Sequence, residues 1–266
     1  LAITSHEVET NGPAMFGDFG ESPCYHLNFY SPIPDQTDYA CPNPNYAWGN
    51  ARAIADTQPH YKGDYRRIYS VEGQNDMIAK ARAKGYLVSY NHPNWSKQSY
   101  PDYIGLEGIT ALEVYNTGCA VGGWTLDESD HVLDEFLMAG KRVYPVATDD
   151  NHGEHDMCGG WVRFKADSLT YENIFNAYAK GDFYASWGPE IRSLWVEEGV
   201  IHITCGPASR IIATYGSRSS RVVSGQALTE AAFPLRRDDG YVRITVVDEQ
   251  GRCADTNAYF IDELMK

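Results

Sequence analysis

The stretch Arg142–His152, with the sequence RVYPVATDDNH, is the segment from which the fold of the chain is best inferred. Its apolar part (143–147) is short and bounded by turn signals, which predicts a buried strand. The strand ends in Asp149, Asp150 and His152. Since active sites lie at the carboxyl ends of parallel strands, such an Asp and His can direct ligand atoms at one metal ion. A polar turn with a solvated histidine explains this stretch equally well.

A unit of helix, glycine, strand and polar cluster recurs along the chain. The first example is a predicted helix at Gln74–Lys84, then Gly85 and a strand at Tyr86–Tyr90 that ends in Asn91 and His92. The other predicted elements are a strand at 109–115 that ends at Asn116, a helix after the capping-box pattern Thr125–Glu128, a helix at 170–180 and a strand at 183–186. Such alternation predicts a parallel sheet, and site residues at the strand ends favour a barrel.

The composition changes after Gly188-Pro189. Short apolar segments, such as Val200–Thr204 and Tyr241–Val247, are separated there by Gly, Ser and charged turns, with no helical pattern between them. We therefore predict a β/α barrel domain at 1–188 and a small antiparallel β-sandwich-like appendage at 189–266.

Composition limits the classes of function. The 266 residues suffice for one large domain with a small appendage, and their net charge of −14 argues against a nucleic-acid polymer or an anionic membrane as partner. No apolar run approaches the ~20 residues that span a bilayer. The 6 cysteines are scattered without a CxxC pair, which indicates thiols in a reducing cytoplasm.

The polar residues at the ends of the predicted strands form a mixed set of possible metal ligands. They are Glu7, His26, His92, Glu113 with Asn116, and Asp150 with His152. Histidine and carboxylate together suit Zn, Mn or Fe(II). Each also has a simpler explanation: His26 is favoured as a core histidine bonded to a backbone carbonyl, and Glu113 as a residue that supports the ligands.

Four segments resemble motifs of the PHP (polymerase and histidinol phosphatase) family of metal-dependent phosphoesterases. They are SHEVE at 5–9, NHP at 91–93, LEVYN at 112–116 and ATDDNH at 147–152. The segments 181–191 and 248–257 resemble the β appendage of a bacterial subgroup of that family. Each motif is short, so the specific part of the resemblance is the order and spacing of the motifs along the chain.

The resemblance implies a distorted seven-stranded β/α barrel that holds two or three divalent ions (Zn, Mn or Fe). Glu7 resembles the bridging carboxylate, His92 the ligand of the His-Pro motif, and His26 a further ligand. Asp150 and His152 correspond to the last ligand pair, and the Asp-x-His spacing selects Asp150 over its neighbour. The family's N-terminal His-x-His and Thr-Asp-His strands have no counterpart here, so we expect the barrel to lack its first two units. The resemblance therefore leaves undecided whether this chain is catalytically active.

The expected function is hydrolysis of a small phosphorylated metabolite or nucleotide by metal-activated water, in the cytoplasm. Asp150 and His152 are the candidate catalytic residues, and Asn116 and Lys97 are candidate substrate contacts. Three alternatives stay open: a metal-dependent amide or ester hydrolase, a carbohydrate-binding protein that works through its aromatic residues and β appendage, and a catalytically degenerate scaffold. The sequence leaves the oligomeric state open.

Overall fold

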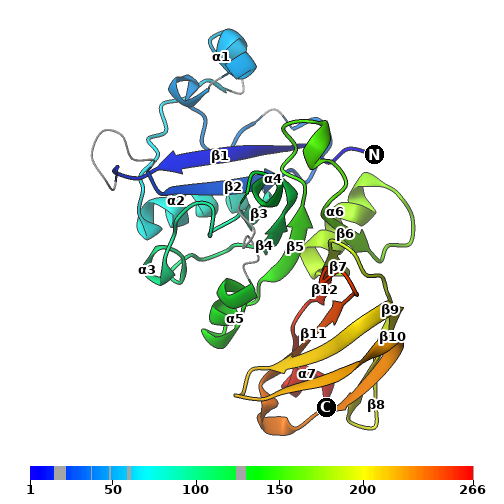
Figure 1. Ribbon diagram of the computed structural model, residues 1–266. Helices are drawn as coiled ribbons and strands as arrows, with labels where there is room; N and C mark the ends of the chain where they lie inside the picture. Colours follow the sequence, from blue (N-terminus) through cyan, green and yellow to red (C-terminus); the bar gives the residue numbers. More distant parts are fainter. Residues whose placement is uncertain (15–21, 37, 48, 59–60, 124–129, 266) are drawn as a thin grey trace. The chain divides into compact units, whose positions relative to one another are not determined.

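The computed structural model describes residues 1–14, 22–36, 38–47, 49–58, 61–123 and 130–265 (Figure 1). The predicted capping box Thr125–Glu128 lies outside these residues. The chain divides into two compact units. Unit 1 comprises residues 1–111 and 166–179, and unit 2 comprises residues 112–165 and 180–266.

Unit 1 contains three described strands and several helices. They are β1 (Ser5–Asn11), β2 (Cys24–Tyr30), the 3-10 helix η1 (Pro44–Tyr46), α1 (Gly49–Ala55), α2 (Val71–Ala83), β3 (Leu87–Tyr90), α3 (Tyr100–Tyr103) and α6 (Tyr171–Lys180), whose last residue belongs to unit 2. β1 pairs antiparallel with β2, and β2 pairs antiparallel with β3. Figure 1 shows β1 and β2 side by side.

Alternation of side chains gives the β1–β2 pair one apolar and one polar face. Tyr25, Leu27 and Phe29 of β2 are completely buried, and Val8 of β1 lies opposite Leu27. Since successive side chains of a strand point to opposite faces, the residues between these positions share the other face. This second face carries Glu7 and the other polar residues of the candidate site.

Helix α2 confirms the helix predicted from the spacing of its apolar residues. It buries Met77, Ile78 and Ala81. Ser70 caps its N-terminus, because its side chain accepts a hydrogen bond from the Gly73 backbone N–H at 3.1 Å. Gly85, with φ of 85°, follows the helix in the left-handed conformation that ends helices.

Unit 2 holds most of the strands. Its described elements are β4 (Ala111–Asn116, whose first residue belongs to unit 1), α4 (Thr117–Val121), α5 (Asp130–Met138), β5 (Tyr144–Thr148), the 3-10 helix η3 (Glu154–Asp156), β6 (Trp161–Phe164), β7 (Phe183–Ser186), β8 (Ile191–Glu197), β9 (Val200–Tyr215), β10 (Ser220–Pro234), the 3-10 helix η4 (Arg237–Asp239), β11 (Tyr241–Val247), β12 (Cys253–Thr256), β13 (Tyr259–Phe260) and α7 (Ile261–Leu264). The strands predicted at 143–147 and 183–186 correspond to β5 and β7.

An eight-stranded sheet organises the C-terminal part of unit 2. Its order is β10-β9-β11-β12-β7-β6, with β8 paired to β9 and β13 paired to β11. The long strands β9 and β10 form the ribbon at its edge (Figure 1). The central strand β11 is buried along its whole length, and Val242, Ile244 and Val246 belong to the core of this sheet. The sheet includes β6 and β7, which precede residue 189.

The predicted seven-stranded, PHP-like β/α barrel, complete or without its first units, is wrong. The described strands lie in two sheets rather than one closed barrel, and strand (36%) exceeds helix (24%). The first strand also covers Ser5–Asn11 and not the residues before them, so Glu7 lies inside a strand and not after one. The repeat of helix, glycine and strand predicted elements individually, but strand pairing depends on contacts between residues distant in sequence, which periodicity does not encode.

Candidate metal centre

Glu7, Glu9 and His26 lie on the polar face of the β1–β2 pair. In the antiparallel register, Glu9 is directly opposite His26, and Glu7 is opposite Asn28, two residues further along β2. Residues opposite each other share a face, so the two carboxylates flank the imidazole along the strand. The side chain of His26 is 15% exposed, against 38% for Glu7 and 40% for Glu9, so it lies beneath them.

The two ring nitrogens of His26 face different carboxylates. Its Nδ1 lies 3.2 Å from Glu7 Oε1, and its Nε2 lies 3.6 Å from Glu9 Oε1. The Nε2 atom is buried without a hydrogen-bond partner among the described residues. The ion pair with Glu9 compensates for part of the burial of this nitrogen.

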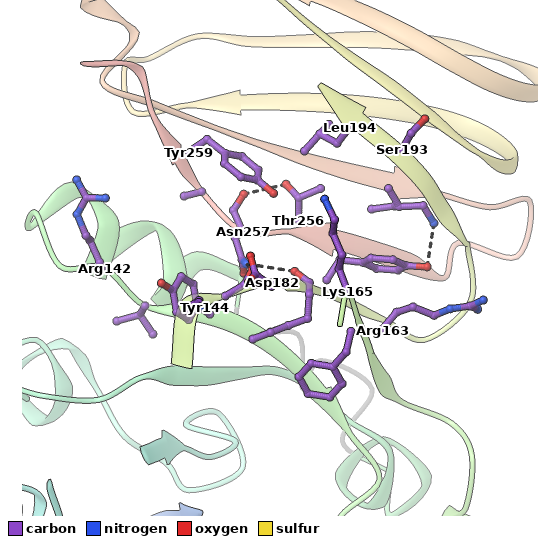
Figure 2. A pocket seen from close by; sticks show the side chains of 18 of the residues that line it. Arg142, Tyr144, Arg163, Lys165, Asp182, Ser193, Leu194, Thr256, Asn257 and Tyr259 are labelled. Carbon is purple, nitrogen blue, oxygen red and sulfur yellow. Dashed lines mark hydrogen bonds between the residues drawn. The ribbon is translucent and has the colours of Figure 1, made fainter. Parts of the chain in front are cut away.

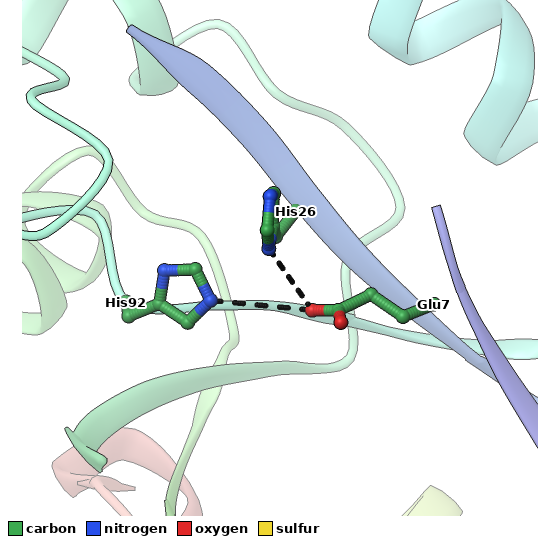
Figure 3. A group of neighbouring side chains, drawn as sticks. All are labelled: Glu7, His26 and His92. Carbon is green, nitrogen blue, oxygen red and sulfur yellow. Dashed lines mark ion pairs between the residues drawn. The ribbon is translucent and has the colours of Figure 1, made fainter. Parts of the chain in front are cut away.

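His92 enters from the turn that follows β3. Its φ of 25° lies in the left-handed region, a strained backbone for a residue other than glycine. The turn is closed by a hydrogen bond from Ser96 N–H to the His92 carbonyl (3.0 Å), and Ser96 Oγ lies 3.1 Å from His92 Nδ1. This contact turns Nε2 of the buried ring toward Glu7 Oε1, at 4.0 Å. Figure 3 shows both imidazoles directed at the Glu7 carboxylate.

Asn91 holds Glu7 in place. Its Nδ2 donates to Glu7 Oε1 (2.9 Å), and its backbone N–H donates to the carbonyl of His26 (3.0 Å). Asn91 is 1% exposed, so the carboxylate receives this hydrogen bond from a fixed donor. Such support of a ligand by a neighbouring hydrogen bond is typical of metal centres.

Trp95 provides an aromatic wall beside the two histidines. Its ring centroid lies 5.0 Å from that of His92, edge to face, and 5.5 Å from that of His26. The two imidazoles are 4.8 Å apart. An aromatic wall lowers the local dielectric and strengthens the attraction between the carboxylate and any cation at this place.

The carboxylates of this site favour positive charge beside them. Burial opposes ionisation of Glu7, but its contacts with His26 and Asn91 outweigh burial and lower its pKa. Burial likewise disfavours the imidazolium of His26, but Cys24, Glu7 and Glu9 outweigh it and raise the pKa of His26 from 6.5 to about 12. His26 therefore holds its proton when no ion is bound, and a divalent ion at this place would have to displace it.

The geometry of the three ligand atoms fits a small divalent ion. One ligand atom each of Glu7, His26 and His92 lies within 4.8 Å of the other two. Around a tetrahedral zinc ion, ligand atoms about 2.1 Å from the metal lie roughly 3.4 Å apart. The distances from Glu7 Oε1 to His26 Nδ1 and His92 Nε2, 3.2 and 4.0 Å, are close to that spacing. Two histidines and one carboxylate with open positions are a pattern typical of catalytic zinc and of non-haem iron.

The remaining predicted ligands belong to unit 2. Asn116 is completely buried, and its Nδ2 lies 3.0 Å from Glu113 Oε2 and 3.2 Å from Asp150 Oδ2. Its Oδ1 accepts from Cys119 N–H and so caps α4. Thr148 Oγ1 donates to the other oxygen of Glu113 at 2.6 Å. Asn116, the predicted substrate contact, therefore positions Glu113 and Asp150.

The structure separates the roles of two adjacent aspartates. Asp149 accepts hydrogen bonds from the backbone N–H groups of Cys158 (2.6 Å), Gly159 (2.8 Å) and Gly160 (3.0 Å). Burial alone would raise the pKa of Asp149, but these donors outweigh it and lower the pKa. Asp149 therefore organises the 158–160 loop, whereas Asp150 has a φ of 47° and turns toward Asn116.

His152 lies on an exposed turn with its side chain 71% exposed. The turn is held by Asp156, which accepts from His152 N–H at 2.9 Å and from Gly153 N–H at 2.9 Å. His152 Nδ1 lies 2.7 Å from the carbonyl of Asp150, so this nitrogen carries the proton. The lone pair is then on Nε2, the nitrogen that can bind a metal or accept a proton.

Lys97, the other predicted substrate contact, is exposed in the turn after His92, with φ of 56°. Sequence reasoning missed Ser96 and Trp95. The position of Ser96 four residues after His92, across an Asn91-His92-Pro93 turn, is a signal that could have indicated it. No sequence signal distinguishes Trp95 from the other tryptophans.

Two general features complete the description. None of the 6 cysteines, all of which lie in the described ranges, forms a disulfide. Among the helices that the structure describes, none combines the length and the apolar character needed to cross a bilayer.

No protein-family model matches the chain, and neither a curated protein nor a solved structure matches it.

Proposed function

We propose that this chain is a metal-dependent hydrolase related to the PHP phosphoesterases, acting on a small phosphorylated metabolite or nucleotide in the cytoplasm. The observation that carries the proposal is the convergence of Glu7, His26 and His92 from two strands and a turn. The resemblance at 5–9 and 91–93 selects Glu7 and His92, and it also implies His26 as a further ligand. The barrel of that family is not part of the proposal.

Each residue of the centre has a distinct task. A divalent ion (Zn, Mn or Fe) held by Glu7, His26 and His92 would supply Lewis acidity toward a phosphoryl oxygen and a source of hydroxide at neutral pH. Asn91 fixes the Glu7 carboxylate, and Ser96 fixes the ring of His92. These contacts pre-orient the ligands, which reduces the reorganisation needed on binding.

Asp150 and His152 provide the second ligand pair in this proposal, for a second or third ion. Asn116 orients Asp150, and the carbonyl of Asp150 orients the imidazole of His152. The exposed Nε2 of His152 is also suited to proton transfer with solvent, the task of a general acid or base. Exposure of His152 agrees with this second role.

The test is metal content, measured by elemental analysis after purification without chelator. The samples are the wild-type chain, Glu7→Gln, His152→Ala and the control His131→Ala, which replaces an exposed histidine of α5. We expect at least two equivalents of Zn, Mn or Fe in the wild type and the control. Glu7→Gln should lose the ion of the unit 1 centre, whereas His152→Ala should lose the ion held by Asp150 and His152.

A screen of phosphate release then tests the reaction. Nucleoside monophosphates and sugar phosphates serve as substrates, with p-nitrophenyl acetate as the ester control. Phosphate release that falls with Glu7→Gln supports the phosphoesterase. Ester cleavage without phosphate release supports the amide or ester hydrolase instead. If the wild-type chain holds no metal even after incubation with each ion, the proposal is refuted. The remaining interpretation is then a catalytically degenerate scaffold protein.

A further inference from the structure

Unit 2 contains a pocket that the metal centre does not use. Its volume is about 880 Å³, within the range of small-molecule sites. The walls come from β6 and β7, from the start of β8, from the segment 256–260 and from the segment 142–144 (Figure 2). The pocket is therefore built on strand pairs, which hold side chains more precisely than loops do.

The charge of the pocket is opposite to that of the whole chain. Five cationic side chains and three carboxylates line it, whereas the chain carries a net charge of −14. The cations are Arg142, Arg163, Lys165, Lys180 and Arg192, and the carboxylates are Asp182, Glu190 and Glu263. A local excess of positive charge in an acidic protein attracts anions to this pocket specifically.

Arginines neutralise two of the three carboxylates. Glu190 Oε1 lies 3.4 Å from Arg163, and Glu190 Oε2 lies 3.3 Å from Arg192. Glu263 Oε1 lies 2.8 Å from Arg142. Because Arg163 and Arg192 share the single charge of Glu190, one positive charge of this group remains, and the two lysines opposite Asp182 contribute the other.

Lys165 is placed to contact a ligand. Its backbone N–H donates to the carbonyl of Asp182 at 2.8 Å, which continues the antiparallel β6–β7 pairing. Because side chains alternate along a strand, Lys165 shares a face with Arg163 and with Tyr184, which lies opposite Arg163. Within the described ranges, the ammonium of Lys165 forms no ion pair. Figure 2 shows its side chain running into the pocket toward Thr256.

Asn257 adds a hydrogen-bond acceptor. It is 3% exposed, and its Nδ2 donates to the carbonyls of Gly181 and Phe183, the latter at 3.1 Å. These two acceptors fix the orientation of the amide, so its Oδ1 cannot exchange places with Nδ2. The Oδ1 atom is buried and has no hydrogen-bond partner among the described residues. A ligand hydroxyl is a donor that would satisfy it.

Aromatic rings supply apolar contact area in the same pocket. Tyr144, Tyr184 and Tyr259 are half-buried among the lining residues. The hydroxyl of Tyr184 accepts from the Ile191 N–H at 3.1 Å, which holds that ring against β8. Fixed aromatic rings stack on the faces of sugars and bases at a low cost in conformational entropy.

We propose that this pocket binds a small organic phosphate that carries a hydroxyl group, with the phosphate at Lys165 and Arg163, the hydroxyl at Asn257 and the ring against the tyrosines. The inference concerns a site other than the metal centre. It is independent of the proposed function, because neither Glu7 nor a metal ion takes part. A sugar phosphate and a nucleoside monophosphate share this chemistry.

Calorimetric titration of the full chain tests the proposal. The probes are glucose 6-phosphate, AMP, unphosphorylated glucose and inorganic phosphate. The variants are Lys165→Gln, the conservative Lys165→Arg and the matched control Lys62→Gln, which removes the same charge from an exposed lysine of unit 1. All titrations are repeated in Glu7→Gln.

We expect binding of glucose 6-phosphate or AMP. The probe with the lower Kd shows whether the pocket prefers a sugar phosphate or a nucleoside monophosphate. Lys165→Gln should weaken binding about tenfold or more, as loss of a hydrogen bond to a charged group does, whereas Lys165→Arg and Lys62→Gln should retain it. Binding should persist in Glu7→Gln and be absent for glucose. Failure of both organic phosphates to bind, an equal loss in Lys62→Gln, or loss of binding in Glu7→Gln would each overturn the proposal.

Discussion

The Nδ1 atom of His26 lies 3.2 Å from Glu7 Oε1, across two neighbouring antiparallel strands. The two residues are diagonal neighbours, because Glu9 and not Glu7 is directly opposite His26. A shift of one residue in the β1–β2 register would move Glu7 to the opposite face of the sheet. The candidate metal centre therefore depends on the burial of Val8 opposite Leu27, which fixes this register.

Replacement of Glu7 by Gln should remove the thermal stabilisation that a divalent ion gives. The amide keeps the size of the side chain but removes the charge that attracts the ion. In the wild type, Zn²⁺ at a hundred times its Kd would stabilise the fold by about 2.7 kcal/mol. Thermal unfolding with and without Zn²⁺ measures the difference, and the exposed Glu172→Gln serves as control. An equal rise in Tm for Glu7→Gln would place the ion elsewhere.

Asn91→Asp should destabilise the metal-free chain, and a divalent ion should reverse the loss. The change puts a second carboxylate beside Glu7 Oε1 in place of the donor at 2.9 Å. Loss of that partly buried hydrogen bond to a charged group costs about 1–3 kcal/mol, and repulsion between the carboxylates adds to it. Urea unfolding with and without Zn²⁺ measures both effects, with the exposed Asn176→Asp as control. Destabilisation that persists in saturating Zn²⁺ would contradict a cation at this position.

Asp149→Asn should destabilise the fold more than Asp150→Asn does. Three backbone N–H groups donate to Asp149, and an amide offers one acceptor oxygen where the carboxylate offers two. We expect a loss of about 1–3 kcal/mol in the free energy of unfolding. Asp150→Asn should leave stability nearly unchanged and reduce metal content instead. Urea unfolding and elemental analysis of both variants distinguish the two roles, and the reverse ranking would refute the assignment.

Arg243→Met should be strongly destabilising. Arg243 is 4% exposed, and its Nε and Nη2 contact the two oxygens of Asp134 at 2.8 and 2.9 Å. Arg243 Nη1 also lies 3.5 Å from the completely buried carboxylate of Asp255, and loss of that ion pair inside the fold costs about 3–5 kcal/mol. The exposed Arg237→Met is the control. Urea unfolding should also show that Arg243→Met with Asp134→Leu loses less stability than the sum of the two single changes. Strict additivity would mean that the pair does not interact.

Individual helices and strands were predictable where they depend on the spacing of apolar residues close together in the sequence. The apolar spacing at 77, 78 and 81 with Gly85 predicted α2, and the short apolar run at 143–147 predicted β5. Strand pairing was not predictable from the same patterns. The β1–β2 and β2–β3 pairs are antiparallel, and β1 and β2 precede the recurring unit from which the parallel sheet was predicted. An apolar strand has the same alternation or run of residues whichever neighbour it pairs with.

The sequence by itself determined which residue types carry the site: Glu7, His26 and His92 offer a carboxylate and two imidazoles, and the alternation within β1 and β2 places the first two on a polar face. Only the tertiary structure decided that His92 turns its Nε2 toward Glu7 and that Asp149 serves the 158–160 loop. The reason is physical. Side-chain chemistry and periodicity are local properties, whereas the direction of a ligand atom follows from register, turns and hydrogen bonds between distant residues.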